Sequence, residues 1–259
     1  GSPTVKGRGH VVLKLLWTQP VLWLCLALGC LVSPGVSFGV APEPVSGAAQ
    51  YVADLVYRSG QGKDIHIGSA FLLREAERGS YRIRLDFEIE RAGAFSALLM
   101  PEEKTLFVIS YALSAYVAVP VQGDERFAGE LVPSLAAAFM PFGVPALAIR
   151  EEKRESLPAA THGKLLCTRH RVLYELMFMG DAFRAALTEW SSPAVPFLPV
   201  RVDELQDWDA PDSPRGSILL KSIRSGELGL GEELFQMPEG VVRYGSALNM
   251  LLYALAAQW

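Results

Sequence analysis

The segment 81–90 constrains the fold more strongly than any other part of the sequence. Over these ten residues apolar and charged side chains alternate without a break: Tyr81, Ile83, Leu85, Phe87 and Ile89 against Arg82, Arg84, Asp86, Glu88 and Glu90. A period of two predicts a β-strand with one buried and one solvated face. Because parallel strands are usually apolar on both faces, the pattern favours an antiparallel sheet.

Other strand candidates are separated by short turn sequences, which is typical of a meander of hairpins. They cover residues 51–57, 65–73, 95–100, 105–109, 116–121, 164–176, 183–190, 197–203 and 217–223. Two parts of the chain favour helix instead. One is a proline-broken excursion over about 122–160, whose charged run 150–155 is expected to be a solvated exit, and the other is the apolar C-terminus, about 246–259. The predicted fold class is mainly β, of the α+β type.

The first 41 residues have the order of a bacterial secretory signal. Lys6, Arg8 and Lys14 precede a stretch without charge from Leu15 to Ala41, and small residues end it. The short apolar core of this stretch predicts a cleaved signal peptide over 1–41. Two alternatives stay open: the uncharged stretch is long enough for an uncleaved anchor, and Cys30 follows an approximate lipobox that would make it a lipidation site.

Residues 42–259 are predicted to form one domain with an acidic balance. Removing the three positive charges of 1–41 lowers the formal net charge from −4 to −7. Net charge of this sign does not attract nucleic acid phosphates, so a nucleic acid partner is not expected. Cys167 is the one cysteine of this part of the sequence. It cannot close an internal disulfide, and its apolar flanks predict a buried thiol.

A search for catalytic motifs finds none that would predict an enzyme. His66, His162 and His170 stand in no zinc-binding spacing, and the sequence has no G-x-S-x-G elbow and no complete dinucleotide-binding glycine motif. Acidic pairs such as Glu232-Glu233 lie in polar turns, where solvated charge is the ordinary interpretation. We therefore expect no catalytic residues, no metal site and no cofactor.

Large aromatic residues are the candidates for a binding function. Six lie on or beside predicted strands: Phe71, Phe87, Phe95, Phe107, Trp190 and Phe197. They could simply fill a core. They could also line an apolar groove between a curved sheet and a loosely fitting helix, where an acyl chain would gain about 0.8 kcal/mol per buried methylene.

Several segments, in this order, resemble the outer-membrane lipoprotein-sorting (LolA/LolB-like) superfamily, and in particular a secreted branch of it. In the first half they are 82–87, 94–104 and the strand through Phe107. In the second half they are 161–176, Glu189-Trp190 with 197–202, and 223–240. The segment 223–240 is the most specific of these, because Phe235, Pro238 and Gly240 all match the same motif.

The resemblance, which spans about 50–244, implies a strongly curved antiparallel sheet, or half-barrel, wrapped around short helices and enclosing an apolar cavity. It also implies a non-enzymatic periplasmic or outer-membrane-associated carrier of a lipid or lipoprotein acyl chain in a Gram-negative bacterium. Arg84 matches the strand arginine that matters for ligand release in such carriers, which adds it to the cavity candidates. The alternative is a sensor or structural module that contacts another envelope protein through the C-terminal helix.

Overall fold

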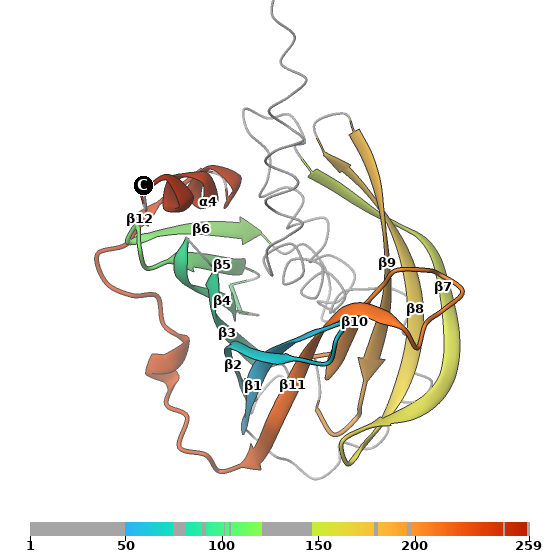
Figure 1. Ribbon diagram of the computed structural model, residues 1–259. Coiled ribbons are helices and arrows are strands. Elements are labelled where there is room, and N and C mark those ends of the chain that lie inside the picture. The colour runs from blue at the N-terminus through green and yellow to red at the C-terminus, as the bar shows by residue number, and fades with distance from the viewer. Residues whose placement is uncertain are drawn as a thin grey trace, which may run out of the picture.

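The fold is dominated by one large sheet, drawn in the computed structural model of Figure 1. The structure describes residues 50–74, 81–89, 92–100, 102–103, 105–120, 147–178, 181–195, 198–245 and 247–257. The predicted signal peptide over 1–41, Cys30 and Phe197 lie outside the described residues, as does the part of the predicted excursion that covers 122–146.

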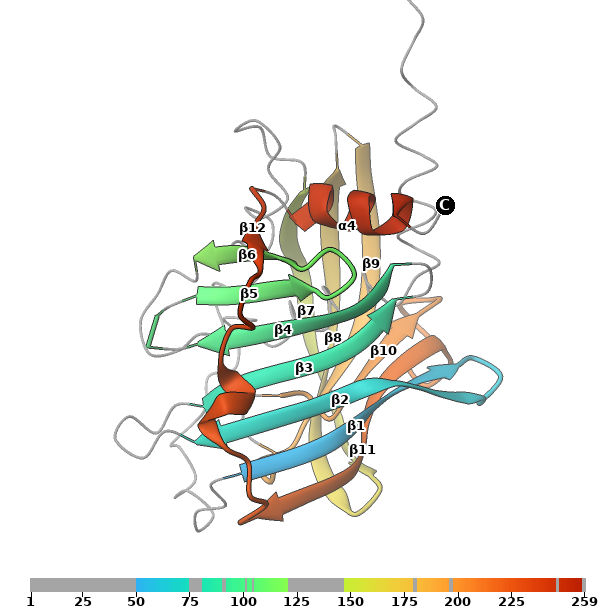
Figure 2. The same ribbon diagram turned by 90° about the vertical axis from the view of Figure 1, so that its left-hand side faces the viewer.

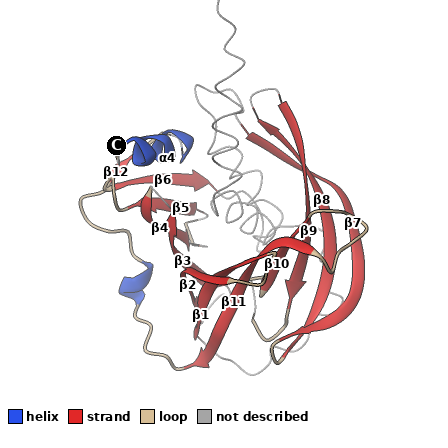
Figure 3. Cartoon of the chain, in the orientation of Figure 1, coloured by secondary structure: helices blue, strands red, loops and turns tan. Residues whose placement is uncertain are grey.

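Within the described residues strands form nearly all of the regular structure, as the red strands of Figure 3 show. The first half holds β1 (Gln50–Ser59), β2 (Asp64–Arg74), β3 (Tyr81–Ile89), β4 (Gly93–Met100), β5 (Thr105–Ser110) and β6 (Ala115–Pro120). The second half holds β7 (Leu147–His162), β8 (Leu165–Phe178), β9 (Asp181–Ser191), β10 (Arg201–Leu205) and β11 (Pro214–Gly226). A 3₁₀ turn η3 (Glu232–Phe235), a short β12 (Val242–Arg243) and the helix α4 (Ala247–Ala256) follow.

The twelve strands of the described residues belong to one sheet in the order β12-β6-β5-β4-β3-β2-β1-β11-β10-β9-β8-β7. Every neighbouring pair is antiparallel except β12 with β6, which is parallel. The pairing of β1 with β11 joins the two halves. Figures 1 and 2 show the sheet bending strongly, so that β3–β6 and β7–β9 lie on opposite sides of the curve. The sheet is mainly antiparallel, as predicted, and its ends do not pair with each other to close it.

The helical part of the prediction is not confirmed. Within the described residues the sheet does not wrap around short helices; α4 lies against β5 and β6, inside the range 246–259 expected to be helical. None of the helices in this part of the chain has the length and hydropathy to span a bilayer.

The interpretation of 147–160 as the end of a helical excursion is wrong, because these residues form most of β7. Its charged run is not a solvated exit. Arg154 pairs with Glu189 on β9 at 3.0 Å, and Glu155 pairs with Arg171 on β8 at 2.5 Å. Arg171 stands on the neighbouring strand β8, and Glu189 stands on β9, one strand further away, so both charges of β7 have partners on other strands of the sheet. A strand can therefore form here without an apolar period.

The two faces of the sheet can be distinguished by the C-terminal segment 227–245. This segment runs across β2–β6 on the outside of the curve (Figure 2), so we call the face it covers the outer face and the opposite one the inner face. Arg84 lies on the outer face, because its guanidinium contacts Leu234 of this segment. Side chains alternate along a strand, so Ile83 and Leu85 lie on the inner face. The buried positions of the 81–89 pattern are therefore the inner ones.

The backbone of β2 and that of β3 approach closely at Gly68, which faces Phe87 next to a β-bulge. A Cβ atom at Gly68 would lie 1.8 Å from the carbonyl oxygen of Asp86. Because the obstacle is backbone, a side chain there can be accommodated only if the two strands separate.

Gly68→Ala should therefore lower the free energy of unfolding by at least ~2 kcal/mol, as overpacking against backbone does. Gly245→Ala is the matched control, since a Cβ there meets nothing within 4 Å, and it should change stability by less than about 0.5 kcal/mol. Urea denaturation of the three proteins measures both values. Equal stability of the two variants would show that β2 and β3 are not packed as closely as described.

Candidate functional site

The inner face of β1–β6 is a continuous apolar surface built by strand register. Residues that pair across neighbouring strands point to the same face, and the inner rows contain almost only apolar side chains. Between 1% and 9% of each of the following side chains is exposed: Tyr51, Ala53, Leu55, Leu72, Ile83, Leu85, Phe95, Ala97, Leu99, Leu106 and Val117. Together with α4, which adds Met250 and Ala254, they form part of the main hydrophobic cluster, which also includes buried residues of β8–β11.

Two of the predicted cavity residues, Phe87 and Phe95, lie on this inner face. They face each other across β3 and β4, with ring centroids 5.9 Å apart and ring planes inclined by only 12°. Ser110 follows in the same row on β5. Its hydroxyl is buried without a hydrogen-bond partner, so a polar atom lies beside the stacked rings.

Phe71 and Phe107 lie on the outer face, so their prediction as cavity residues is corrected. Register places both in one row with Arg84 and Leu98. They pack against a second, smaller cluster centred on Phe235 of η3, which is fully buried. The period of two could not separate them from Phe87 and Phe95, because both faces of β2, β4 and β5 carry large apolar residues.

Trp190 is also an outer-face residue, since its neighbour Glu189 lies in the inner row with Val202. Its indole Nε1 donates a hydrogen bond to Asp203 at 2.8 Å. The guanidinium groups of Arg169 and Arg201 lie over its ring at 4.3 and 4.5 Å from the centroid. These contacts hold β8, β9 and β10 together on the outside of the sheet, and they direct Trp190 away from the inner face.

Arg84 fastens the C-terminal segment to the outer face. Its Nη1 donates to the carbonyl oxygen of Leu234 at 2.6 Å, its Nε donates to Asp86 at 2.7 Å, and its Nη2 donates to the hydroxyl of Tyr111 at 3.0 Å. A role in ligand release, as the resemblance implies, would require contact with a ligand on the inner face. The structure places Arg84 on the other side of the sheet, which corrects its prediction as a cavity residue.

Arg84→Met should loosen the segment 227–245, because it removes the bond to Leu234 and leaves the Asp86 carboxylate without its guanidinium. We expect a stability loss of ~1–3 kcal/mol and faster amide hydrogen exchange over residues 228–240. Arg58→Met is the control, since Arg58 pairs with Asp64 on the adjoining strand at 2.7 Å. Unchanged exchange over 228–240 in the Arg84 variant would exclude the fastening role.

The inner face of β7–β10 differs from that of β1–β6, because it contains charged residues. Its rows include Glu151, Arg154, Glu189 and Glu204, next to Val172, Tyr174 and Leu187. Sequence reasoning missed these charges. One signal was present: Ala185, Leu187 and Glu189 share one face of a strand, and a carboxylate in such a row has to be buried with a partner.

Burial changes the titration of two of these inner-face groups. It raises the pKa of Glu204 to about 6, against a small opposing effect of Arg215. Burial also lowers the pKa of His170, and the positive charge of Arg154 acts in the same direction. Near neutral pH His170 therefore stays uncharged, while Glu204 carries its negative charge in a site where only 12% of its side chain is exposed.

The raised pKa of Glu204 predicts a pH dependence of stability. The folded state holds this proton more tightly than the unfolded chain. The stability that Glu204 contributes is therefore fully present below its ordinary pKa of 4.5 and is lost as the pH rises through about 6. Glu204→Gln should remove this slope and raise the free energy of unfolding at pH 7.5 by about 1–2 kcal/mol. Denaturation experiments at pH values from 4.5 to 7.5 measure both the slope and the change in the free energy of unfolding.

Glu155→Gln provides the opposite control for the Glu204 experiment. Lys153 and Arg171 lower the pKa of Glu155, so neutralising this residue should not stabilise the protein at pH 7.5. If Glu204→Gln left the slope between pH 4.5 and 7.5 unchanged, the Glu204 carboxyl would have to be solvated.

The described residues contain no group of three or more histidine, cysteine or carboxylate side chains that could hold a metal ion. Cys167 is a free thiol with 1% of its surface exposed, as its apolar flanks predicted. Burial raises its pKa, which disfavours the reactive thiolate.

The fold and its two faces define an open, curved antiparallel sheet with an apolar inner wall. No family model matches this sequence, and no curated protein matches it. Among solved structures the chain is similar to a protein of Parabacteroides distasonis that is named as a lipoprotein. The TM-score is 0.36 at 10% identity, over 68% of this chain and 95% of that one.

Two further solved structures are similar at the same level. One is a domain from Vibrio parahaemolyticus named as an outer membrane lipoprotein-sorting protein, with a TM-score of 0.30 at 11% identity, over 74% of this chain and 91% of that one. The other is the lipoprotein LppX of Mycobacterium tuberculosis, with a TM-score of 0.29 at 11% identity, over 70% of this chain and 88% of that one.

Proposed function

We propose that this chain is an exported, non-enzymatic carrier that holds an acyl chain of a lipid or lipoprotein against the inner face of β1–β6. The observation that supports it is the predominantly apolar surface of that face, which continues across six strands of a strongly curved sheet. Such a wall offers an acyl chain dispersion contacts along its length, at a gain of about 0.8 kcal/mol per buried methylene.

The open ends of the sheet suit reversible loading. Because β6 and β7 stand near opposite ends of the strand order, the two sides of the curve can move apart without breaking a hydrogen bond between neighbouring strands. When the sheet bends in this way, the movement is distributed over small changes in the twist between successive strands. A ligand could thus enter between the two sides at little cost in backbone hydrogen bonding.

The sequence of residues 1–41 supports a location outside the cytoplasm. Positive charges, an uncharged apolar stretch and small residues follow in the order of an export signal. We propose a periplasmic or outer-membrane-associated protein, attached through Cys30 if that residue is acylated. Mass spectrometry of the N-terminus of the protein isolated from cell envelopes distinguishes cleavage near Ala41, lipidation at Cys30 and retention of the whole segment.

Binding can be tested with the neutral fluorescent probe N-phenyl-1-naphthylamine and its displacement from the purified full chain by palmitoyl lysophospholipids. Phe87→Ala should weaken displacement at least ~5-fold, because an inner-face aromatic ring is lost. Phe107→Ala is the matched control: it removes the same half-buried side chain from the outer face, and it should leave displacement unchanged at a similar cost in stability.

Two results would contradict the proposal. One is the absence of any probe displacement by the lysophospholipids, combined with the absence of lipid in organic extracts of the purified protein. The other is an equal loss of binding in the Phe87 and Phe107 variants, since a ligand on the inner face cannot contact both side chains.

A further inference from the structure

The inner face changes its chemical character from one side of the curve to the other. Across β1–β6 it is apolar, whereas across β7–β9 it carries a charged cluster made by Glu151, Arg154, Tyr174 and Glu189. Figure 1 shows these two groups of strands facing each other across the curve. The function proposed above uses only the apolar side, and the charged side has no role in it.

Arg154 is the centre of this charged cluster. Its guanidinium donates to both oxygens of Glu151 at 3.1–3.3 Å and to both oxygens of Glu189 at 3.0 and 3.4 Å. The hydroxyl of Tyr174 donates to Glu189 at 3.1 Å. Of the three charged side chains, Arg154 and Glu189 are only 12% and 6% exposed, while Glu151 retains 27%. Glu151 is therefore the carboxylate of the cluster that another molecule can reach.

Stability alone is a poor account of this cluster. Removing Arg154 and Glu189 from water costs free energy that their attraction only roughly offsets, and apolar residues of similar size often serve a core equally well. The same inner rows are filled by apolar residues on β1–β6, so the fold itself accommodates that solution.

The cluster has a surplus of negative charge. On the described inner face of β7–β9 the one cationic side chain, Arg154, stands against two carboxylates, Glu151 and Glu189. Glu204 on β10 does not change this balance, because Arg215 pairs with it at 3.4 Å. His170 does not compensate, since burial and the nearby Arg154 lower its pKa and keep it neutral. A phosphate or carboxylate arriving here would meet carboxylates, while an ammonium group would find free acceptor positions on Glu151.

We propose that this cluster is a headgroup site: it binds the ammonium group of an amphiphile whose acyl chain lies on the inner face of β1–β6, with Glu151 accepting hydrogen bonds from the ammonium. This inference rests on the proposed carrier function and adds a ligand class to it. An amphiphile with an amine headgroup matches the charged and the apolar sides of the curve at once, and an anionic one matches only the apolar side.

The test compares two lysophospholipids with the same palmitoyl chain in the probe-displacement assay on the full chain. Lysophosphatidylethanolamine carries an ammonium group and lysophosphatidylglycerol does not. In 50 mM salt the ethanolamine lipid should displace the probe at a concentration at least ~5-fold lower than the glycerol lipid. The ratio of the two displacing concentrations should be smaller in 500 mM salt, because the ions screen the interaction.

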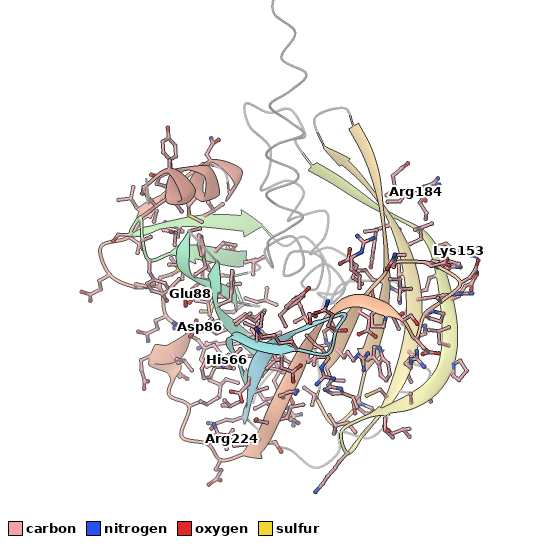
Figure 4. All side chains as sticks on the ribbon, viewed as in Figure 1. His66, Asp86, Glu88, Lys153, Arg184 and Arg224 are labelled. Atoms are coloured by element: carbon pink, nitrogen blue, oxygen red, sulfur yellow. The ribbon has the colours of Figure 1, made fainter. Side chains whose placement is uncertain are left out.

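Neighbouring glutamates on β7 supply a matched pair of variants. Glu151→Gln removes the accessible inner-face carboxylate and should reduce the ratio to about 1–2, as expected for loss of a charge-assisted hydrogen bond. Glu152→Gln makes the same change on the outer face, where Glu152 pairs with Arg184 at 3.0 Å, and should leave the ratio intact. Figure 4 shows Lys153 and Arg184 on that outer side, away from β3–β6.

The outcomes separate the two proposals. Equal displacement by both lipids in the unmodified protein, or stronger displacement by the glycerol lipid, would overturn the headgroup site and leave the carrier function standing. Loss of the preference in the Glu152 variant but not in the Glu151 variant would also overturn it. If neither lipid displaced the probe and organic extracts of the protein held no lipid, the carrier function itself would fail.

Discussion

The pairing of β1 with β11 is the interaction on which the rest of the structure depends. It joins residues 50–59 to residues 216–226 and turns two local meanders into one sheet. Without it, β2–β6 and β7–β10 would share no strand neighbours, and the curve that sets them opposite each other would not exist. The same pairing carries the register from one half to the other, so it also decides which side chains of β7–β10 share a face with Leu55 and Leu85.

The two faces of the sheet differ in the contacts that their side chains make. On the outer face the charged and aromatic residues are tied to each other and to covering segments: Arg84 to the segment 227–245, and Trp190 to Asp203 and two arginines. Gln50 reinforces the cover, since its side-chain amide accepts hydrogen bonds from the backbone of Leu228 and Leu230. The outer face of β2–β6 is thus covered by contacts within the chain, and the carrier function proposed above assigns the ligand to the inner face.

The sequence predicted the elements whose period is regular and failed where partners come from elsewhere in the chain. The alternation over 81–89 became β3 because one face is buried in register with Ala70 and Ala97. The run 150–155 has no apolar period, and its charges find partners elsewhere in the chain: Arg171 on the neighbouring β8 and Glu189 on β9 beyond it. The cavity prediction rests on residue type for Trp190 and on the family resemblance for Arg84. The face of a side chain depends on register, which the composition of one strand does not contain.

The dependence of β1 on β11 has a consequence for how the chain acquires its structure. Strand β1 pairs with β2 locally, but its second partner, β11, comes more than 150 residues later, and the cover of β2–β6 is made by residues that follow β11. Long-range closure of this kind slows folding. During vectorial emergence, from a ribosome or through a membrane pore, the early hairpins would remain incomplete until the C-terminal segment arrives, and a slow-folding chain of this kind is well suited to threading in an extended state.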